Sequence, residues 1–261
     1  MFKRLTQISK RRRLMISTAV LTVLLIISTF FNVDESQFFI ILIGVAAYFF
    51  TFFSILEGIS DKEWLVLFIP PVYFTLVFYF FYFFLPQRWL TRLPFVTIYA
   101  ISIYALLLSQ NIFNIGAEKS LQLFRAASSV NYLYLTISEF LISSLILSLK
   151  LLFIYNFVLM FIASFPLALQ FLWAVNPKES IDREVVRYAW LIAFIIAQGA
   201  LVFSFIPLSS AVFALLLTAC FYSLCGLFQA YLQARLFKER IREYIFVMGF
   251  ISGIVILSLR W

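Results

Sequence analysis

Glu139 is the residue of this 261-residue chain whose type and surroundings most clearly suggest chemistry. It is the only acidic residue within the long apolar stretches, where an ionised carboxylate is costly enough to mark a functional site. Ser143 follows it one helical turn later, on the same face. We therefore predict a proton-linked or substrate-contacting carboxyl group that faces a cavity. The alternative is that Glu139 lies near the cytoplasmic membrane surface or is simply protonated.

Two amides and a guanidinium form a second candidate site. Asn111, Asn114 and Arg125 lie close together in the sequence, and such groups can hold a phosphate or carboxylate. The ligand would be a substrate or the head group of an anionic lipid. Helix capping and anchoring at the membrane surface explain the same residues without any ligand.

A pair of glycines is the third feature. Gly249 and Gly253 form a GxxxG motif in the last apolar stretch. Small residues four positions apart allow helix backbones to approach closely, either inside one bundle or across a dimer. We expect packing inside the bundle.

The sequence lacks the common catalytic and metal-binding motifs. Histidine is absent, which removes the commonest general base and metal ligand. There is no phosphate-binding glycine loop, zinc-binding spacing or nucleophile elbow. Cys220 and Cys225 are five positions apart, so a helix places them on different faces. We predict no catalytic residue, no metal and no cofactor.

The elements that position these residues are membrane-spanning helices. Hydrophobic residues make up 64% of the chain and charged residues 12%, against about 25% charged residues in a soluble domain. Spans of about 20 residues consume almost the whole length, so residues 1–261 form one integral membrane domain without a soluble part. We predict an all-α, polytopic transmembrane helix bundle.

The stretch 132–175 determines the number of spans. It carries only two charges, on Glu139 and Lys150. As one helix it would be about 66 Å long, against a hydrocarbon core of about 30 Å, so it is two spans that reverse near Lys150. About nine spans are therefore expected, at residues 14–31, 37–56, 64–85, 93–109, 129–149, 152–175, 188–205, 210–228 and 244–259. The polar segment 110–128 is expected to be an amphipathic helix that lies on the membrane or leads into the fifth span.

The distribution of basic residues predicts the orientation. With nine spans, sixteen of the 20 Lys and Arg residues fall on the side of the N-terminus, which places that end in the cytoplasm and the C-terminus outside. The net charge of +8 therefore indicates topology and contact of the cytoplasmic loops with anionic lipids, and not binding to nucleic acid.

Three short segments carry a resemblance to other proteins. They are Asn111-Ile112-Phe113-Asn114-Ile115-Gly116, Leu121-Gln122-Leu123-Phe124-Arg125-Ala126-Ala127 and Ser164-Phe165-Pro166-Leu167. In these segments the chain resembles uncharacterised multispanning bacterial membrane proteins of unknown function. The resemblance implies the plasma (inner) membrane of a prokaryote and supplies no activity.

The short loops and the missing catalytic motifs favour a non-enzymatic protein. It would be a subunit or scaffold of a membrane complex, with a membrane-protein partner, or a small-solute transporter. The alternative is a membrane-embedded enzyme that acts on a lipid-linked substrate at the cytoplasmic face. The residues that could serve such an enzyme are Glu57, Asp61, Glu63, Glu118 and Arg125.

Overall fold

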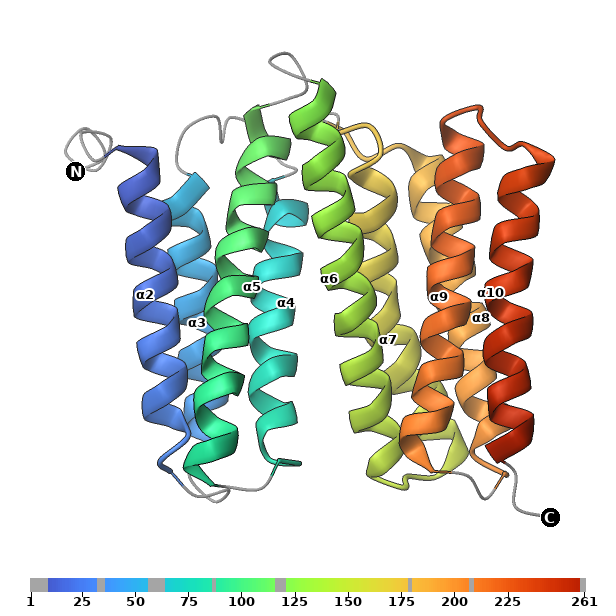
Figure 1. Cartoon of the computed structure of the whole chain (residues 1–261), viewed down its shortest axis with the longest axis horizontal. Coiled ribbons are helices and arrows are strands. Elements are labelled where there is room, and N and C mark those ends of the chain that lie inside the picture. Colours follow the sequence, from blue (N-terminus) through green and yellow to red (C-terminus); the bar gives the residue numbers. More distant parts are fainter. Residues whose placement is uncertain are drawn as a thin grey trace. The chain divides into compact units, whose positions relative to one another are not determined.

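The computed structural model describes residues 9–31, 36–55, 64–85, 88–115, 121–177, 180–206 and 209–258. Within these ranges the chain forms nine helices and no strand (Figure 1). They are α2 (Lys10–Ser28), α3 (Ser36–Ile55), α4 (Trp64–Tyr82), α5 (Trp89–Ile115), α6 (Leu121–Ser148), α7 (Phe153–Trp173), α8 (Arg183–Phe203), α9 (Ser210–Leu232) and α10 (Lys238–Ser258). The predicted all-α bundle of about nine helices is confirmed.

Eight of these helices, α3 to α10, are long and apolar enough to cross a membrane. The remaining one, α2, begins with four consecutive basic residues, which lower its mean hydropathy. The chain is therefore a multi-pass membrane protein. The reversal near Lys150 is also confirmed, because α6 ends at Ser148 and α7 begins at Phe153. Lys150 itself has a φ of 49°, a left-handed conformation that ends a helix.

Several helix ends differ from the predicted span ends. The fourth span, expected at 93–109, is part of the longer helix α5, which begins at Trp89 and ends at Ile115. The fifth, expected at 129–149, belongs to α6, which begins at Leu121. The segment 110–128 thus contributes the end of α5 and the start of α6, and residues 116–120 lie outside the described ranges. Hydropathy marks the part of a helix inside hydrocarbon, whereas hydrogen bonding carries the helix beyond it.

The helices group into two compact units, residues 1–134 and 135–261, so that α6 contributes to both. In the first unit α3 packs against α2 and α4, and α5 packs against the same two helices. In the second unit α7 packs most extensively against α8, and α9 packs against α10. Each unit contains several of the eight helices that are apolar enough to cross a membrane.

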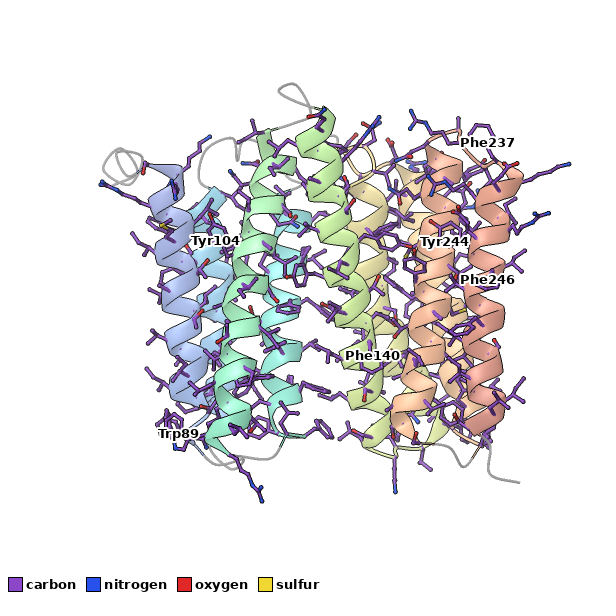
Figure 2. The ribbon with its side chains drawn as sticks, in the orientation of Figure 1. Trp89, Tyr104, Phe140, Phe237, Tyr244 and Phe246 are labelled. Carbon is purple, nitrogen blue, oxygen red and sulfur yellow. The ribbon has the colours of Figure 1, made fainter. Side chains whose placement is uncertain are left out.

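Close helix packing in the second unit depends on two glycines. A methyl group added at Gly226 of α9 would fall on the phenol ring of Tyr244, which projects from α10 toward α9 (Figure 2). A methyl group at Gly199 of α8 would lie 2.7 Å from Cδ2 of Leu217. These glycines allow α8, α9 and α10 to approach one another closely.

Candidate functional site

Glu139 lies on the part of α6 that belongs to the second unit, opposite α7. The connection between the two helices covers only residues 149–152, so α6 and α7 are antiparallel neighbours. Ser143 is one turn further along α6, and Ser164 lies on α7. These three side chains are fully buried.

The two oxygens of the Glu139 carboxyl group have different surroundings. Oε1 accepts a hydrogen bond from the Ser164 hydroxyl at 2.8 Å and a longer one from the Ser143 hydroxyl at 3.4 Å. Oε2 is buried and has no hydrogen-bond partner among the described residues. One oxygen is therefore held in place by the protein, and the other can accept a hydrogen bond or carry a proton.

In the part of the chain that the structure describes, no positive charge pairs with the Glu139 carboxyl group. Within the described ranges no Lys or Arg forms an ion pair with Glu139, and the other ionisable groups near enough to interact electrostatically are Cys220 and Cys225 on α9. Both cysteines are free thiols. An ionised carboxylate at the centre of a membrane helix costs about 2.5 to 3.5 kcal/mol on insertion scales. The group is held at lower cost when it carries a proton or when a cation lies beside it.

The depth of Glu139 follows from its partner on α7. Ser164 is near the middle of the helix Phe153–Trp173, about 15 Å from either end at about 1.5 Å per residue. Glu139 therefore lies level with the middle of α7.

The amide and guanidinium residues do not form one exposed site. Asn111 is buried on α5, and Asn114 donates a hydrogen bond of 3.1 Å to the carbonyl of Ile55, the last residue of α3. Arg125 is exposed on α6. Asn114 thus makes a contact of the capping type, which agrees with the explanation that needs no ligand.

The GxxxG motif lies on an open face of α10. A methyl group at Gly249 or Gly253 would meet no atom within 4 Å. Tyr244 and Val255 are the only buried residues of α10, so most of this helix faces away from the rest of the second unit. The expected packing of Gly249 and Gly253 inside the bundle is therefore not seen within the described residues.

Sequence reasoning missed several residues of these contacts. Ser164 stands between Ala163 and Phe165 in an apolar helix, and no local pattern connects it to Glu139. Asn156 of α7 donates a hydrogen bond of 2.9 Å to the Ser204 hydroxyl at the end of α8. Its position three residues after the start of α7 is a weak signal for such a contact, because amides commonly bond near helix ends.

Eight apolar helices define a multi-pass membrane protein, and its second unit contains a buried carboxyl group. The chain belongs to a family described as protein of unknown function (DUF5656), whose pattern matches residues 125–258 and thus contains α7 to α10 and Glu139. No curated protein and no solved structure matches the chain.

Proposed function

We propose that this protein is a small-solute transporter of a prokaryotic plasma membrane in which Glu139 binds and releases the coupled proton. The observation that carries this proposal is the fully buried carboxyl group with Oε1 held by Ser164 and Oε2 unpaired. Ionisable groups within spans commonly serve proton and ion pathways, and they are otherwise paired. A group that only joined two helices would need no unpaired oxygen.

Proton binding suits the neighbours of Glu139 better than a permanent ion pair does. The hydroxyl groups of Ser143 and Ser164 can donate to a carboxylate or accept from a carboxylic acid, because a hydroxyl rotates freely. The site can therefore hold the charged and the neutral form in turn, which a coupled transporter requires.

The proposed orientation places the connection 149–152 outside the cell. In the second unit the connections after α7 and after α9 lie at one end, and the connections after α6 and after α8 lie at the other (Figure 1). The basic residues of this unit concentrate at the first of these ends. The positive-inside rule then assigns that end to the cytoplasm.

The test of this proposal is proton uptake into proteoliposomes that contain a trapped pH-sensitive dye. A panel of amino acids, sugars, organic acids and organic cations is added in turn, and the wild-type protein is compared with Glu139→Gln. We expect solute-dependent proton uptake that falls about a hundredfold or more in the variant, as for loss of a proton-transfer group. Equal proton uptake by both proteins across the panel would reject the proposal.

A second experiment examines the carboxyl group without knowledge of the solute. Dicyclohexylcarbodiimide is lipid-soluble and reacts with protonated carboxyl groups inside membranes. We expect peptide mass spectrometry to find the adduct on Glu139, and no adduct at this position in Glu139→Gln. A wild-type protein that stays unmodified would show that the group does not carry an exchangeable proton.

The second candidate function, a subunit of a membrane complex, is favoured by the open face of α10. A methyl group added at Gly249 or Gly253 would meet no packed neighbour within 4 Å among the described residues. Native mass spectrometry of protein extracted gently from its own membrane tests this function. A stoichiometric second protein that Gly249→Leu removes and Gly44→Ala retains would support it, because the methyl group at Gly44 makes only ordinary contact with Leu76.

The enzyme alternative rests on five charged residues. Glu57, Asp61, Glu63 and Glu118 lie outside the described residues. Arg125, the remaining residue of that set, is exposed on α6.

A further inference from the structure

We infer that Glu139 exchanges its proton through a polar route that opens only at the end of the second unit where α6 meets α7, at residues 149–152. This inference rests on the proposed function and adds the route, its lining residues and the side from which the proton arrives. It comes from the arrangement of buried polar atoms along α7.

The lining residues of the route share one face of α7. Asn156, Met160 and Ser164 follow one another at intervals of four, which places them in one row along the helix. All three are buried, with relative exposures of 3%, 0% and 0%. The row extends over eight residues, or about 12 Å, from the beginning of α7 to the level of Glu139.

Hydrogen-bonding atoms connect this row to the carboxyl group. The Ser143 hydroxyl lies 3.4 Å from Glu139 Oε1 and 3.5 Å from the sulfur of Met160. Ser143 thus stands one turn from Glu139 in the direction of the 149–152 connection. It brings a hydroxyl group to the point where Met160 would otherwise interrupt the polar row.

Asn156 forms the outer part of the route. Its Nδ2 donates to the hydroxyl of Ser204 at 2.9 Å and to the carbonyl of Leu151 at 3.3 Å. Its Oδ1 is buried and has no hydrogen-bond partner among the described residues. Ser204 is partly exposed, so the row reaches the surface of the unit at this end.

Two unpaired acceptors therefore mark the two ends of the row, Oδ1 of Asn156 and Oε2 of Glu139. A buried acceptor without a partner is unfavourable, and a bound water molecule removes this cost. Water at both positions would connect Glu139 with the aqueous side, as a proton relay requires.

In the opposite direction, the next turns of α6 and α7 in line with Glu139 and Ser164 carry apolar side chains. Leu135 lies one turn before Glu139 on α6, and Leu167 and Ala168 lie one turn after Ser164 on α7. Each of these residues is fully buried, with a relative exposure of 0%. Among the described residues of α6 and α7, the row that contains Ser164 therefore continues from Glu139 toward residues 149–152, as expected for a transporter open to that side.

The experiment compares four single cysteine variants of the full-length protein. Asn156→Cys and Met160→Cys lie on the route, while Leu135→Cys and Leu167→Cys are matched controls, because all four native side chains are almost completely buried. The probe is Ag⁺, a small hydrated cation that reacts with thiols. Peptide mass spectrometry after denaturation and alkylation resolves each position, so Cys220 and Cys225 are left unchanged.

We expect the cysteines at positions 156 and 160 to react with Ag⁺ at least about tenfold faster than those at 135 and 167. This ratio corresponds to a difference of about 1.4 kcal/mol in the free energy needed for Ag⁺ to reach the thiol. Similar rates at all four positions, or faster reaction at 135 and 167, would overturn the inference. In sealed right-side-out vesicles, external Ag⁺ should reach positions 156 and 160. Protection of both there, with reaction only after the vesicles are opened, would overturn the assigned side.

A second variant keeps the test independent of cysteine chemistry. Asn156→Leu should slow proton uptake about tenfold or more, while Glu139 is still modified by the lipid-soluble carbodiimide, which arrives through the hydrocarbon. Asn156→Ser, which keeps a polar side chain, should restore uptake to within about twofold of wild type by preserving a hydrogen-bonding group. If Asn156→Leu transports at the wild-type rate, the route does not pass this residue.

The two proposals fail in different ways. If Ag⁺ follows the expected order but Glu139→Gln leaves proton uptake unchanged, the route exists and the transport proposal is wrong. If proton uptake depends on Glu139 but positions 135 and 167 react first, the transport proposal stands and the route is wrong.

Discussion

The hydrogen bond between Gln110 and Asn131 in the first unit and the bond between Ser164 and Glu139 in the second unit both join buried polar side chains of two helices. The first connects two neutral amides at 2.9 Å, and the second connects a hydroxyl and a carboxyl group at 2.8 Å. Their lengths are almost the same. What differs is the chemistry of the group that accepts the bond.

The difference shows which buried polar groups only hold helices together. Amides stay neutral at any physiological pH, so a pair of them in a membrane stabilises helix packing without a change of charge. A carboxyl group can gain or lose a proton, and Oε2 of Glu139 is left without a partner in the described part of the chain. We therefore assign a structural role to the amide pair and a proton-binding role to Glu139.

Other polar contacts of the first unit are of the structural kind. Tyr99 and Thr75 share a buried hydrogen bond of 3.0 Å. Arg92 donates from Nε to the hydroxyl of Tyr82 at 2.8 Å and lies over the rings of Phe30 and Trp89. The guanidinium is thus held by hydrogen bonding and cation–π contact between the ends of three helices.

The largest expected effect comes from exchanging the two acceptors, with Glu139→Gln and Asn131→Asp in one protein. The exchange keeps one buried carboxyl group on α6 but moves it to position 131, away from the Ser164 hydroxyl. We expect proton uptake in proteoliposomes to remain about a hundredfold or more below wild type, because proton transfer depends on the position of the group. Recovery of uptake would show that any carboxyl group on this helix is sufficient.

A smaller effect is expected from Asn131→Leu, which removes the acceptor for Gln110. Interhelical hydrogen bonds in membranes contribute on average about 0.6 and up to about 1.7 kcal/mol, so the free energy of unfolding should fall by about 1 kcal/mol. Thermal unfolding in detergent measures this change, with Leu133→Ala at an exposed site as control. Proton uptake per folded molecule should stay within about twofold of wild type, since an average bond of this kind changes an equilibrium only by a small factor. Unchanged stability with lost uptake would reverse the roles assigned to the two contacts.

The sequence was sufficient to predict most of the fold, because the solvent for this chain is hydrocarbon. Each span needs about 20 apolar residues, and this requirement is visible without any knowledge of packing. The ends of α5 and α6 were not predictable in this way, since both helices continue beyond the apolar segment. The segment 110–128 is polar and helical, and hydropathy does not tell where one helix ends and the next begins.

The site was predictable only in part. Glu139 and Ser143 share one helix, so their spacing in the sequence places them on one face. Ser164 belongs to a different helix, and its contact with Glu139 depends on the register between α6 and α7, which side-chain packing determines. Side-chain packing also determines which glycines lie in contacts between helices. Gly226 packs against Tyr244 but belongs to no motif, whereas the GxxxG motif of Gly249 lies on an open face.

A moderate effect on transport is expected from Ser164→Ala, which removes the 2.8 Å donor to Glu139. A hydrogen bond to a charged group contributes about 1.5 to 3 kcal/mol. If most of this energy stabilises the Glu139 carboxylate relative to the carboxylic acid, proton uptake should fall about tenfold. Ser164→Thr keeps the hydroxyl and should restore uptake. Ser144→Ala, a partly buried serine on the next position of α6 after Ser143, is the matched control and should have no effect. Equal losses in both alanine variants would indicate a general weakening of helix packing.

The smallest effect is expected from Ser143→Ala. Its bond to Glu139 is 3.4 Å long, and its sulfur neighbour Met160 lies at 3.5 Å, so the single hydroxyl proton is divided between two weak acceptors. We expect proton uptake to fall only about twofold, because a long hydrogen bond contributes little to holding the carboxyl group. The loss that remains reflects the interruption of the polar row at Met160. The measurement is again dye-monitored uptake, in parallel with Ser164→Ala. If Ser143→Ala and Ser164→Ala lose uptake equally, the two hydroxyl groups contribute equally to holding Oε1, and the long bond from Ser143 is as important as the short one from Ser164.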